Sequence, residues 1–251
     1  MKHVFVINPA AGKGKALGII KPQIDEICKK HALDYEIYVT EKKNDGIEFV
    51  ERRAKSGEEL RFYACGGDGT LNEVVNGAFG YKNAQVAVIP LGSGNDFIRL
   101  FGSKEDFLKL ENVINGVPVE FDVIKCGNEI AINQCSMGMD AEVCAMQGKI
   151  KKLPLVTGEG AYYIGCLYAL LKKFRNHFTV QIDDGEKITQ DCLFCFAGNS
   201  RWYGGGFMAG PISTGISPIS KEARSSLSTA TTPRPSMLTA RRSMLPILHL
   251  K

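Results

Sequence analysis

Residues 66–73 read Gly-Gly-Asp-Gly-Thr-Leu-Asn-Glu, and these residue types could together hold a phosphate group. The segment follows a short apolar run, Leu60 to Cys65, that we interpret as a buried strand, and it opens a helical pattern from Leu71 to Phe79. Glycines leave backbone N–H groups uncovered, and the N-terminus of a helix attracts anions. Thr70 and Glu73 have the spacing of a capping box, so we expect Thr70 to cap this helix. The pattern predicts a phosphate-binding turn, although a tight turn without a ligand has the same composition.

Two further glycine-rich loops follow apolar runs in the same half of the chain. Residues 8–14 read Asn-Pro-Ala-Ala-Gly-Lys-Gly and follow the strand-like segment His3 to Ile7. Residues 91–97 read Leu-Gly-Ser-Gly-Asn-Asp-Phe and follow Val86 to Ile89. We expect all three loops at the carboxyl ends of parallel strands, which is the edge where sheets of this kind bind ligands. Three loops that share one edge are a stronger indication of a ligand site than any one of them.

The elements that must position these loops alternate between strand and helix over the first 125 residues. The expected strands are 3–7, 35–39, 60–64 and 86–89, and the expected helices are 15–30, 45–54 and 71–79. Such alternation predicts right-handed βαβ crossovers and a mostly parallel sheet with helices on both faces. We therefore expect an α/β protein whose N-terminal, nucleotide-binding domain comprises residues 1–122.

From about Val117 the pattern changes to the period-two alternation typical of strands. The expected strand pairs are 119–123 with 129–136 and 178–182 with 188–197, the latter joined by a turn at 183–186. A helical region at residues 160–175 lies between the two pairs. We assign residues 123–211 to a second, incomplete β-rich domain, and we expect the cleft between the two domains to hold the substrate.

The net charge of +4 comes from the last 40 residues. Residues 212–251 hold six Lys or Arg and one acidic residue, whereas the remaining 211 residues hold 25 basic and 26 acidic. A neutral body lacks the positive surface that nucleic-acid binding requires, so we expect no nucleic-acid partner. The last 40 residues also contain 13 Ser or Thr and four prolines without hydrophobic periodicity, which cannot bury a core. We interpret residues 212–251 as an atypical tail that is disordered or translated out of frame.

The rest of the composition is that of an ordinary globular protein, with 44% hydrophobic and 23% charged residues. The eight cysteines are scattered through apolar patterns, which indicates reduced thiols and a cytoplasmic protein. Cys192 and Cys195 have C-x-x-C spacing but lack a second pair or a nearby histidine, which argues against a zinc site. The longest uncharged apolar run, Ala161 to Leu171, has 11 residues and is too short to span a bilayer.

Three motifs together resemble the bacterial diacylglycerol kinase and lipid kinase family, which is related to sphingosine kinases and NAD kinases. The motifs are residues 8–14, residues 66–77 (Gly-Gly-Asp-Gly-Thr-Leu-Asn-Glu-Val-Val-Asn-Gly) and residues 90–97 (Pro-Leu-Gly-Ser-Gly-Asn-Asp-Phe), in the order and spacing of the family. The likeness extends to about Met208. It implies that residues 1–122 bind ATP across the three loops and that a lipid hydroxyl accepts the γ-phosphate, most simply in the conversion of diacylglycerol to phosphatidic acid.

Carried over by motif, the resemblance assigns ATP contacts to the three loops and to Thr40, which ends the second strand. The implied ATP-binding residues are Asn8, Pro9, Ala10, Ala11, Gly12, Thr40, Gly66, Gly67, Asp68, Gly69, Thr70, Leu71, Asn72, Glu73 and Ser93. A lone threonine at position 40 is otherwise a common strand-end residue. Lys13 could steer phosphates, but an exposed loop lysine is more commonly only solvated.

Phosphoryl transfer depends on positioning and on charge neutralisation more than on covalent help. Mg²⁺ is the expected counterion, and the sequence assigns it no ligands. Asp68 stands between glycines, and we expect this catalytic carboxylate to orient a metal-bound water or the acceptor hydroxyl. Its alternative role is to hydrogen-bond its own turn. Asp96 likewise has two alternatives, which are catalysis and capping of the helix that it opens.

The sequence departs from the family after the Gly-Gly-Gly-Phe segment at residues 204–207. Family members continue into an Asp-Asp-Gly segment with a Mg²⁺-associated aspartate and an Asp-Gly-Glu motif with the proton acceptor, and neither follows Pro211. Two alternatives therefore stay open: a catalytically inactive nucleotide-binding remnant, and a kinase for a sphingoid base, another glycerolipid or NAD. The expected lipid substrate would be met at the membrane surface, on its inner face, by a monomer or a homodimer.

Overall fold

The computed structural model describes residues 1–139, 141–142, 176–181, 185–208 and 246–250 of the chain. These residues fall into two compact units. The first unit contains the described residues up to Asn133, those from Gly198 onward and the strand near the C-terminus, and the second contains the described residues between Gln134 and Ala197.

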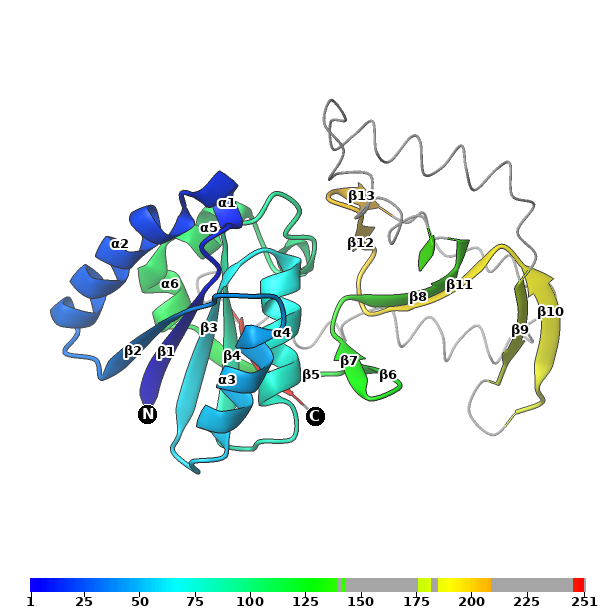
Figure 1. Cartoon of the computed structure of the whole chain (residues 1–251), viewed down its shortest axis with the longest axis horizontal. Helices are drawn as coiled ribbons and strands as arrows, with labels where there is room; N and C mark the ends of the chain where they lie inside the picture. Colours follow the sequence, from blue (N-terminus) through cyan, green and yellow to red (C-terminus); the bar gives the residue numbers. More distant parts are fainter. Residues whose placement is uncertain (140, 143–175, 182–184, 209–245, 251) are drawn as a thin grey trace. The chain divides into compact units, whose positions relative to one another are not determined.

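A six-stranded sheet with the order β2–β1–β3–β4–β14–β5 forms the centre of the first unit (Figure 1). Its strands are β1 (Lys2–Ile7), β2 (Tyr35–Val39), β3 (Leu60–Gly66), β4 (Ala84–Pro90), β5 (Val117–Phe121) and β14 (Pro246–Leu250). The pairs β2–β1, β1–β3 and β3–β4 are all parallel. Every residue of β3 is buried, as expected of a parallel strand with helices on both faces. The predicted α/β class and parallel sheet are therefore confirmed.

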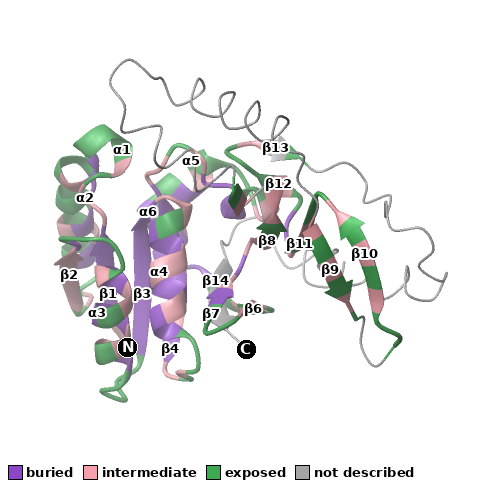
Figure 2. Ribbon diagram, turned by 45° about the vertical axis from the view of Figure 1, so that its right-hand side comes forward, coloured by how far each residue is buried: buried purple, intermediate pink, exposed green. Residues whose placement is uncertain are grey.

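Helices cover both faces of the sheet, and α2, α3, α4 and α6 bury apolar side chains against it (Figure 2). The helical elements are α1 (Ala11–Gly14), α2 (Ala16–Lys30), α3 (Asp45–Ala54), α4 (Asp68–Ala78), the 3₁₀ helix η1 (Phe97–Leu100), α5 (Lys104–Leu108) and α6 (Leu110–Ile114). Residues Ile20, Ile24 and Cys28 of α2 are buried at intervals of four, which places them on one helix face. Helices α2 and α6 share one core cluster, and α3 and α4 share the other.

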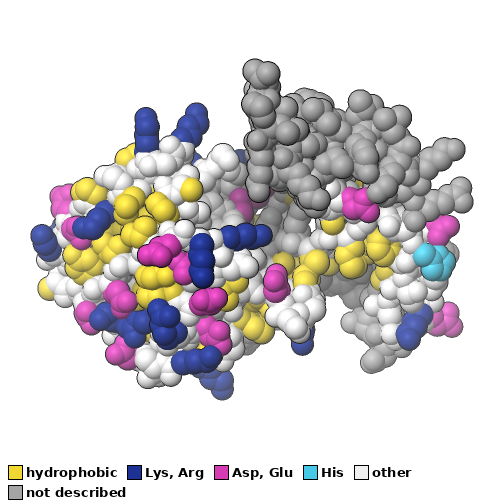
Figure 3. Space-filling view, in the orientation of Figure 1, with side chains coloured by type: hydrophobic (Ala, Val, Ile, Leu, Met, Phe, Trp, Pro, Cys, Tyr) yellow, Lys and Arg dark blue, Asp and Glu magenta, His cyan; other side chains and the backbone are white. Residues whose placement is uncertain are grey.

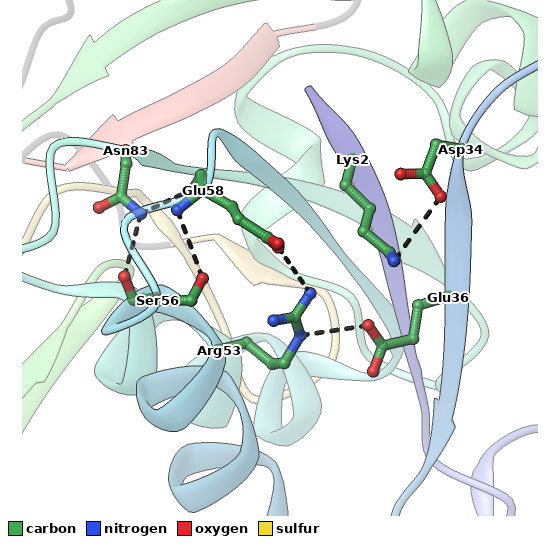
Figure 4. A network of polar contacts seen from close by, with 8 residues as sticks. Lys2, Asp34, Glu36, Arg53, Ser56, Glu58 and Asn83 are labelled. Atoms are coloured by element: carbon green, nitrogen blue, oxygen red, sulfur yellow. Dashed lines mark hydrogen bonds and ion pairs between the residues drawn. The ribbon is translucent and has the colours of Figure 1, made fainter.

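Helix α3 is fastened at its C-terminal end by the polar network in Figure 4. Arg53 donates to Glu36 of β2 over 3.1 Å and to Glu58, in the loop before β3, over 3.0 Å. The Asn83 side chain donates to the backbone carbonyl of Glu58 over 2.7 Å. These groups are partly exposed, so each ion pair contributes little stability, and together they fix where α3 ends.

Helices α3 and α4 pack so closely that a side chain at one position between them would collide with both a backbone and a side chain. A Cβ atom on Gly77 would lie 2.7 Å from the Ile47 carbonyl oxygen and 2.7 Å from Val50 Cβ. Because glycine lacks this atom, α4 can rest directly on α3. This packing matters for the site, since α4 begins at the 66–70 loop.

The strand pairing predicted around residues 119–136 is wrong. Strand β5 ends at Phe121 and pairs in parallel with β14, while β6 (Ile124–Cys126) and β7 (Glu129–Ala131) form a separate antiparallel hairpin. The two residues between β6 and β7 make a tight turn, and Gly127 adopts φ +65° there. The expected connection at 124–128 instead contains β6 and this turn, and the expected partner strand breaks between Ala131 and Gln134, which the period-two pattern does not reveal.

Four strands follow, together with a short hairpin. They are β8 (Gln134–Gly138), β9 (Asn176–Val180), β10 (Ile188–Cys192), β11 (Phe194–Gly198) and the hairpin of β12 (Trp202–Tyr203) with β13 (Phe207–Met208). Strands β9 and β10 pair antiparallel, which confirms the predicted pair, but the second strand breaks at Leu193 and β11 pairs with β8 instead. The helix expected at 160–175 and residues 183–184 of the expected turn lie outside the described residues.

The strand β14 was not expected from the sequence. It lies between β4 and β5, antiparallel to the first and parallel to the second. Residues 212–245 and 251, the rest of the predicted tail, lie outside the described residues. None of the helices in the described part of the chain reaches the length and apolarity that crossing a bilayer requires.

We predict that protonation of His3 makes the first unit acid-sensitive. The ring stacks on Tyr63 with Nδ1 2.7 Å from its hydroxyl, and burial, assisted by the charge of Arg61, lowers the pKa of His3 from 6.5 to about 4. The unfolded chain therefore binds this proton first, so stability is complete above pH 6.5 and falls toward pH 4. The loss should reach on the order of 3 kcal/mol, measured as the free energy of unfolding in urea.

The control is His3→Phe, which keeps a stacked ring and cannot be protonated. Its unfolding free energy should depend less steeply on pH between 6.5 and 4 than that of the wild type. Parallel pH profiles for the two proteins would show that His3 does not govern this dependence.

Candidate active site

The loops after β1, β3 and β4 meet at one edge of the sheet, as the sequence predicts. The backbone N–H of Asn8 donates to the Cys65 carbonyl over 3.1 Å, and its side chain donates to the Thr70 hydroxyl over 3.2 Å. The N–H groups of Leu91 and Gly92 both donate to the Gly66 carbonyl, over 2.8 and 3.1 Å. The three glycine-rich turns are thus joined to one another directly by hydrogen bonds.

Two of these turns approach so closely that only glycine fits at the contact. A Cβ atom on Gly92 would lie 2.5 Å from Gly67 Cα and 3.1 Å from its nitrogen. A Cβ atom on Gly66 would collide with the side chain of Thr70. The glycines in these motifs therefore have a steric function that is independent of any ligand.

Helix α4 begins at Asp68, earlier than predicted, and Gly67 is its N-cap. The capping-box prediction is wrong, because no side chain in the described structure caps this turn, and Thr70 lies inside the helix with its hydroxyl accepting from Asn8. The first turn of a helix leaves N–H groups without intrahelical acceptors. These groups open toward the edge where the three loops meet, which is favourable for an anion.

The 8–14 loop has an unusual backbone. Asn8 Oδ1 accepts from the N–H of Ala10 over 3.0 Å and so starts the turn. Gly12, Lys13 and Gly14 then have φ values of 58°, 59° and 79°, all in the left-handed region. Lys13 is strained there because it has a side chain, and such strain is concentrated at ligand sites.

Asp68 lies against the turn that follows β4. Its Oδ1 accepts from the N–H of Phe97 over 3.4 Å, and a Cβ atom on Gly94 would lie 3.0 Å from its Oδ2. Burial raises the pKa of Asp68 above its ordinary value; the N–H of Phe97 opposes this shift, and the negative charge of Asp96 adds to it. The hydrogen bonds that the structure gives this carboxylate come from the next turn of the site, so the alternative in which Asp68 bonds its own turn is not what the structure shows.

Asp96 is only 6% exposed and does not cap η1 with its side chain, so the capping alternative is not what the structure shows. Its Oδ2 accepts from the N–H of Gly205 over 2.7 Å. Its Oδ1 is buried without a hydrogen-bond partner in the described structure, and Arg99 Nε lies 3.5 Å away. A buried carboxylate oxygen without a hydrogen bond is costly unless a cation completes its environment.

The segment from Trp202 to Gly206 joins the site from far along the chain, and the sequence analysis missed it. The Arg99 guanidinium lies over the Trp202 ring, 5.2 Å from its centroid, and the N–H of Gly205 binds Asp96. Gly205 and Gly206 have φ values of +87° and +126°. Three successive glycines after an aromatic pair were the available signal for a turn that closely approaches another backbone.

Four other predicted residues lie in different surroundings. Thr40 is buried at the end of β2, where its N–H and hydroxyl both bind the Ile7 carbonyl, and Ser93 is exposed on the turn after β4. The Leu71 side chain is buried in the core and can offer only its backbone. Glu73 points away from the α4 N-terminus, toward the loop that follows β2.

Within the described residues, no group of three or more His, Cys, Asp or Glu side chains is arranged to hold a metal ion. Asp68 accepts from the turn that carries Asp96, and the charge of Asp96 acts on the Asp68 carboxylate. A cation held there would need further oxygen ligands from water or from a bound phosphate, as is usual for Mg²⁺.

Comparison with known proteins gives consistent matches. Residues 2–126 match the family described as diacylglycerol kinase catalytic domain. A diacylglycerol kinase of Staphylococcus carnosus (strain TM300) is 34% identical over 162 residues, covering 64% of this chain and 52% of that protein. One of Staphylococcus aureus (strain JH9) is 34% identical over 165 residues, covering 64% and 50%. The crystal structure of a diacylglycerol kinase from Bacillus anthracis (strain Sterne) has a TM-score of 0.55 and 27% identity, covering 82% of this chain and 66% of that one.

The fold is that of a lipid kinase family. The chain belongs to the diacylglycerol kinase catalytic domain family. It spans about half the length of the curated relatives that it matches.

We predict that Gly92→Ala destabilises the first unit, because the added Cβ would overlap Gly67. Overpacking of this kind costs about 1–3 kcal/mol of unfolding free energy. The matched control is Gly69→Ala, since a Cβ at Gly69 meets nothing within 4 Å and alanine favours the helix. Thermal unfolding should show a lower midpoint for the first variant only, and equal midpoints would contradict the steric argument.

Proposed function

We propose that the chain is an ATP- and Mg²⁺-dependent lipid kinase that transfers the γ-phosphate of ATP to the hydroxyl of diacylglycerol and so forms phosphatidic acid. The observation that carries the proposal is the union of three glycine-rich turns at the uncapped N-terminus of α4. Membership of the family supports it. The match covers only 50–52% of the length of the named relatives, so the activity of this chain is an inference from its site.

The triphosphate would bind where the loops meet. The N–H groups in the first turn of α4 and in the left-handed 12–14 segment would donate to phosphate oxygens, as in other glycine-rich phosphate sites. The close contact of Gly67 with Gly92 brings two of the turns near enough to act on the same ligand. Positioning of this kind is the main requirement of phosphoryl transfer.

Asp68 would orient the acceptor hydroxyl. Burial and the neighbouring charge of Asp96 raise its pKa, which makes it a stronger proton acceptor than an exposed carboxylate. The turn at Phe97 fixes its direction through a backbone N–H. Asp68 can therefore hold the hydroxyl proton by a hydrogen bond while the oxygen faces the phosphate.

Mg²⁺ fits the same pair of carboxylates. Asp96 Oδ1 is buried without a hydrogen bond, with the Arg99 guanidinium 3.5 Å away, and the charge of Asp96 acts on Asp68. An ion held near these two carboxylates would therefore depend on further oxygen ligands from water or phosphate. Bound there, the ion would neutralise charge on the phosphates. The Arg99 guanidinium lies near this same Oδ1, while Oδ2 accepts from the N–H of Gly205, so the Asp96 carboxylate is held at both oxygens.

The lipid would be met at a membrane surface, on the inner face, by a protein without a nucleic-acid partner. On the face of the first unit visible in Figure 3, basic and acidic side chains are interspersed, which matches the neutral charge of residues 1–211. A surface of mixed sign does not favour the extended contact with phosphates that nucleic acid makes. A homodimer remains a prediction.

Nucleotide binding without transfer is the second candidate. The match to the curated relatives covers only 50–52% of their length, so whatever the rest of those proteins contributes lies outside the match. Calorimetry with ATP, together with a transfer assay, separates the two candidates. ATP binding without label transfer to any acceptor would favour this second function.

The transfer assay uses γ-labelled ATP, Mg²⁺ and the full chain with a panel of acceptors: diacylglycerol, a monoacylglycerol, a sphingoid base and NAD. We expect label in phosphatidic acid above all other products. Transfer to NAD alone would overturn the lipid assignment, and transfer to the sphingoid base alone would overturn the diacylglycerol assignment.

We predict that Asp68→Asn lowers transfer by about 10²–10⁴-fold while ATP still binds, because the amide cannot accept the proton as the carboxylate does. Circular dichroism should show an unchanged fold. Asp34→Asn, at an exposed aspartate paired with Lys2, is the matched control and should retain full activity. Wild-type turnover in Asp68→Asn would remove Asp68 from the mechanism.

A further inference from the structure

Glu73 links two elements of the site without facing the place where the three loops meet. Its Oε1 accepts from the N–H of Asn44 over 3.1 Å, and its Oε2 accepts from the N–H of Gly46 over 3.2 Å. Glu73 lies on α4, whereas the two donors belong to the loop after β2 and to the start of α3. Both carboxylate oxygens are thus occupied by backbone donors from another element.

The start of α3 depends on this carboxylate for a cap. Asn44, the N-cap residue, is held in the left-handed region with φ 66° and makes no capping hydrogen bond with its own side chain. Uncapped N–H groups at a helix start need an acceptor, and a negative charge there is favoured by the helix dipole. Glu73 supplies both from the neighbouring helix.

Thr40 lies in the same contact. A Cβ atom on Gly46 would be 2.8 Å from Glu73 Oε2 and 3.8 Å from Thr40 Cγ2. Thr40 is itself held to the Ile7 carbonyl at the end of β1. Glu73, the 40–46 loop and the strand that leads into the 8–14 loop therefore form one continuous set of contacts.

A carboxylate in this position is poorly suited to contact a triphosphate directly. Like charges at close range repel, and turning either oxygen toward a phosphate would leave a helix-start N–H of α3 without its acceptor. The negative charge of Glu73 instead stabilises the start of α3, where its two oxygens accept from backbone N–H groups. The resemblance had implied a contact between Glu73 and ATP, and the geometry supports a different use of the residue.

We propose that Glu73 is a positioning residue. It fixes the 40–46 loop, with Thr40, against α4, and so places this loop beside the proposed nucleotide site without touching the nucleotide. The inference rests on the proposed ATP site. Arg53 fastens the other end of α3 to β2, so the helix is fixed at both ends and the loop between Thr40 and α3 has a defined position.

The test compares four variants of the full chain. Glu73→Ala removes both acceptor oxygens, and Glu73→Gln keeps one. Gly46→Ala leaves Glu73 intact but places a methyl group where its carboxylate lies, and its φ tolerates alanine. Glu51→Gln is the matched control, because Glu51 forms an exposed ion pair with Lys55 on the same helix.

The first measurement is ATP affinity by calorimetry. A small displacement of a positioning group can lower a reaction rate by about 100-fold. On the same scale, we expect the ATP affinity of Glu73→Ala to fall by about 10-fold to 100-fold, and that of Glu73→Gln to fall by less. Gly46→Ala should weaken ATP binding to a similar extent as Glu73→Ala. A fifth variant that combines Glu73→Ala with Gly46→Ala should bind ATP only slightly more weakly than either single variant, since both substitutions break the same contact. Glu51→Gln should bind ATP like the wild type.

The second measurement is hydrogen exchange without nucleotide. The backbone amides of residues 44 and 46 should exchange faster in Glu73→Ala and in Gly46→Ala than in the wild type. Thermal midpoints are recorded to show that the variants are folded. This readout tests the loop contact even in a chain that does not bind ATP.

The outcomes separate this inference from the proposed function. A wild-type chain that does not bind ATP contradicts the proposed function. A wild-type chain that binds ATP, with equal affinity in Glu73→Ala, overturns the positioning inference alone. Weak binding in Glu73→Ala with wild-type binding in Gly46→Ala also overturns it, because it would indicate direct contact between Glu73 and the nucleotide.

Discussion

The contact between the turns after β3 and β4 is the constraint on which the rest of the site depends. Gly67 and Gly92 meet backbone to backbone, with no room for a Cβ atom on Gly92 and only tight space for one on Gly67. The Gly66 carbonyl then receives two N–H groups from the neighbouring turn, which closes the contact. Because the two turns are locked together, the first turn of α4 and the turn that carries Asp96 keep a fixed relative position.

Helix α4 carries most of the consequences of that contact. Its first turn is left open for an anion, its Glu73 holds the start of α3, and Gly77 lets α3 pack against it. Asn76 exchanges hydrogen bonds with the backbone of Ile130, over 2.9 and 2.8 Å, and so attaches the β6–β7 hairpin. One sequence motif therefore supplies both a candidate ligand site and the contacts that assemble the elements around it.

The two carboxylates at the site are held in different ways, and this difference suits different uses. Asp68 is bound by a backbone N–H of the next turn and has a raised pKa. Asp96 is buried between Arg99 and the N–H of Gly205, with one oxygen lacking a hydrogen bond. Under the proposed function, the first arrangement would suit proton acceptance, whereas in the second the Arg99 guanidinium already compensates part of the carboxylate charge.

The amino-acid sequence alone determined the alternation of strands and helices, the parallel sheet and the glycine turns at its carboxyl edge. These features follow from local periodicity and from the backbone freedom of glycine, both of which can be read along the chain. Only the tertiary structure decided that the Thr70 hydroxyl accepts from Asn8, that Glu73 turns to the loop after β2 and that Gly205 reaches Asp96. Each of these depends on which backbone donor or acceptor a distant segment brings within hydrogen-bond distance, and residue spacing carries no information about that.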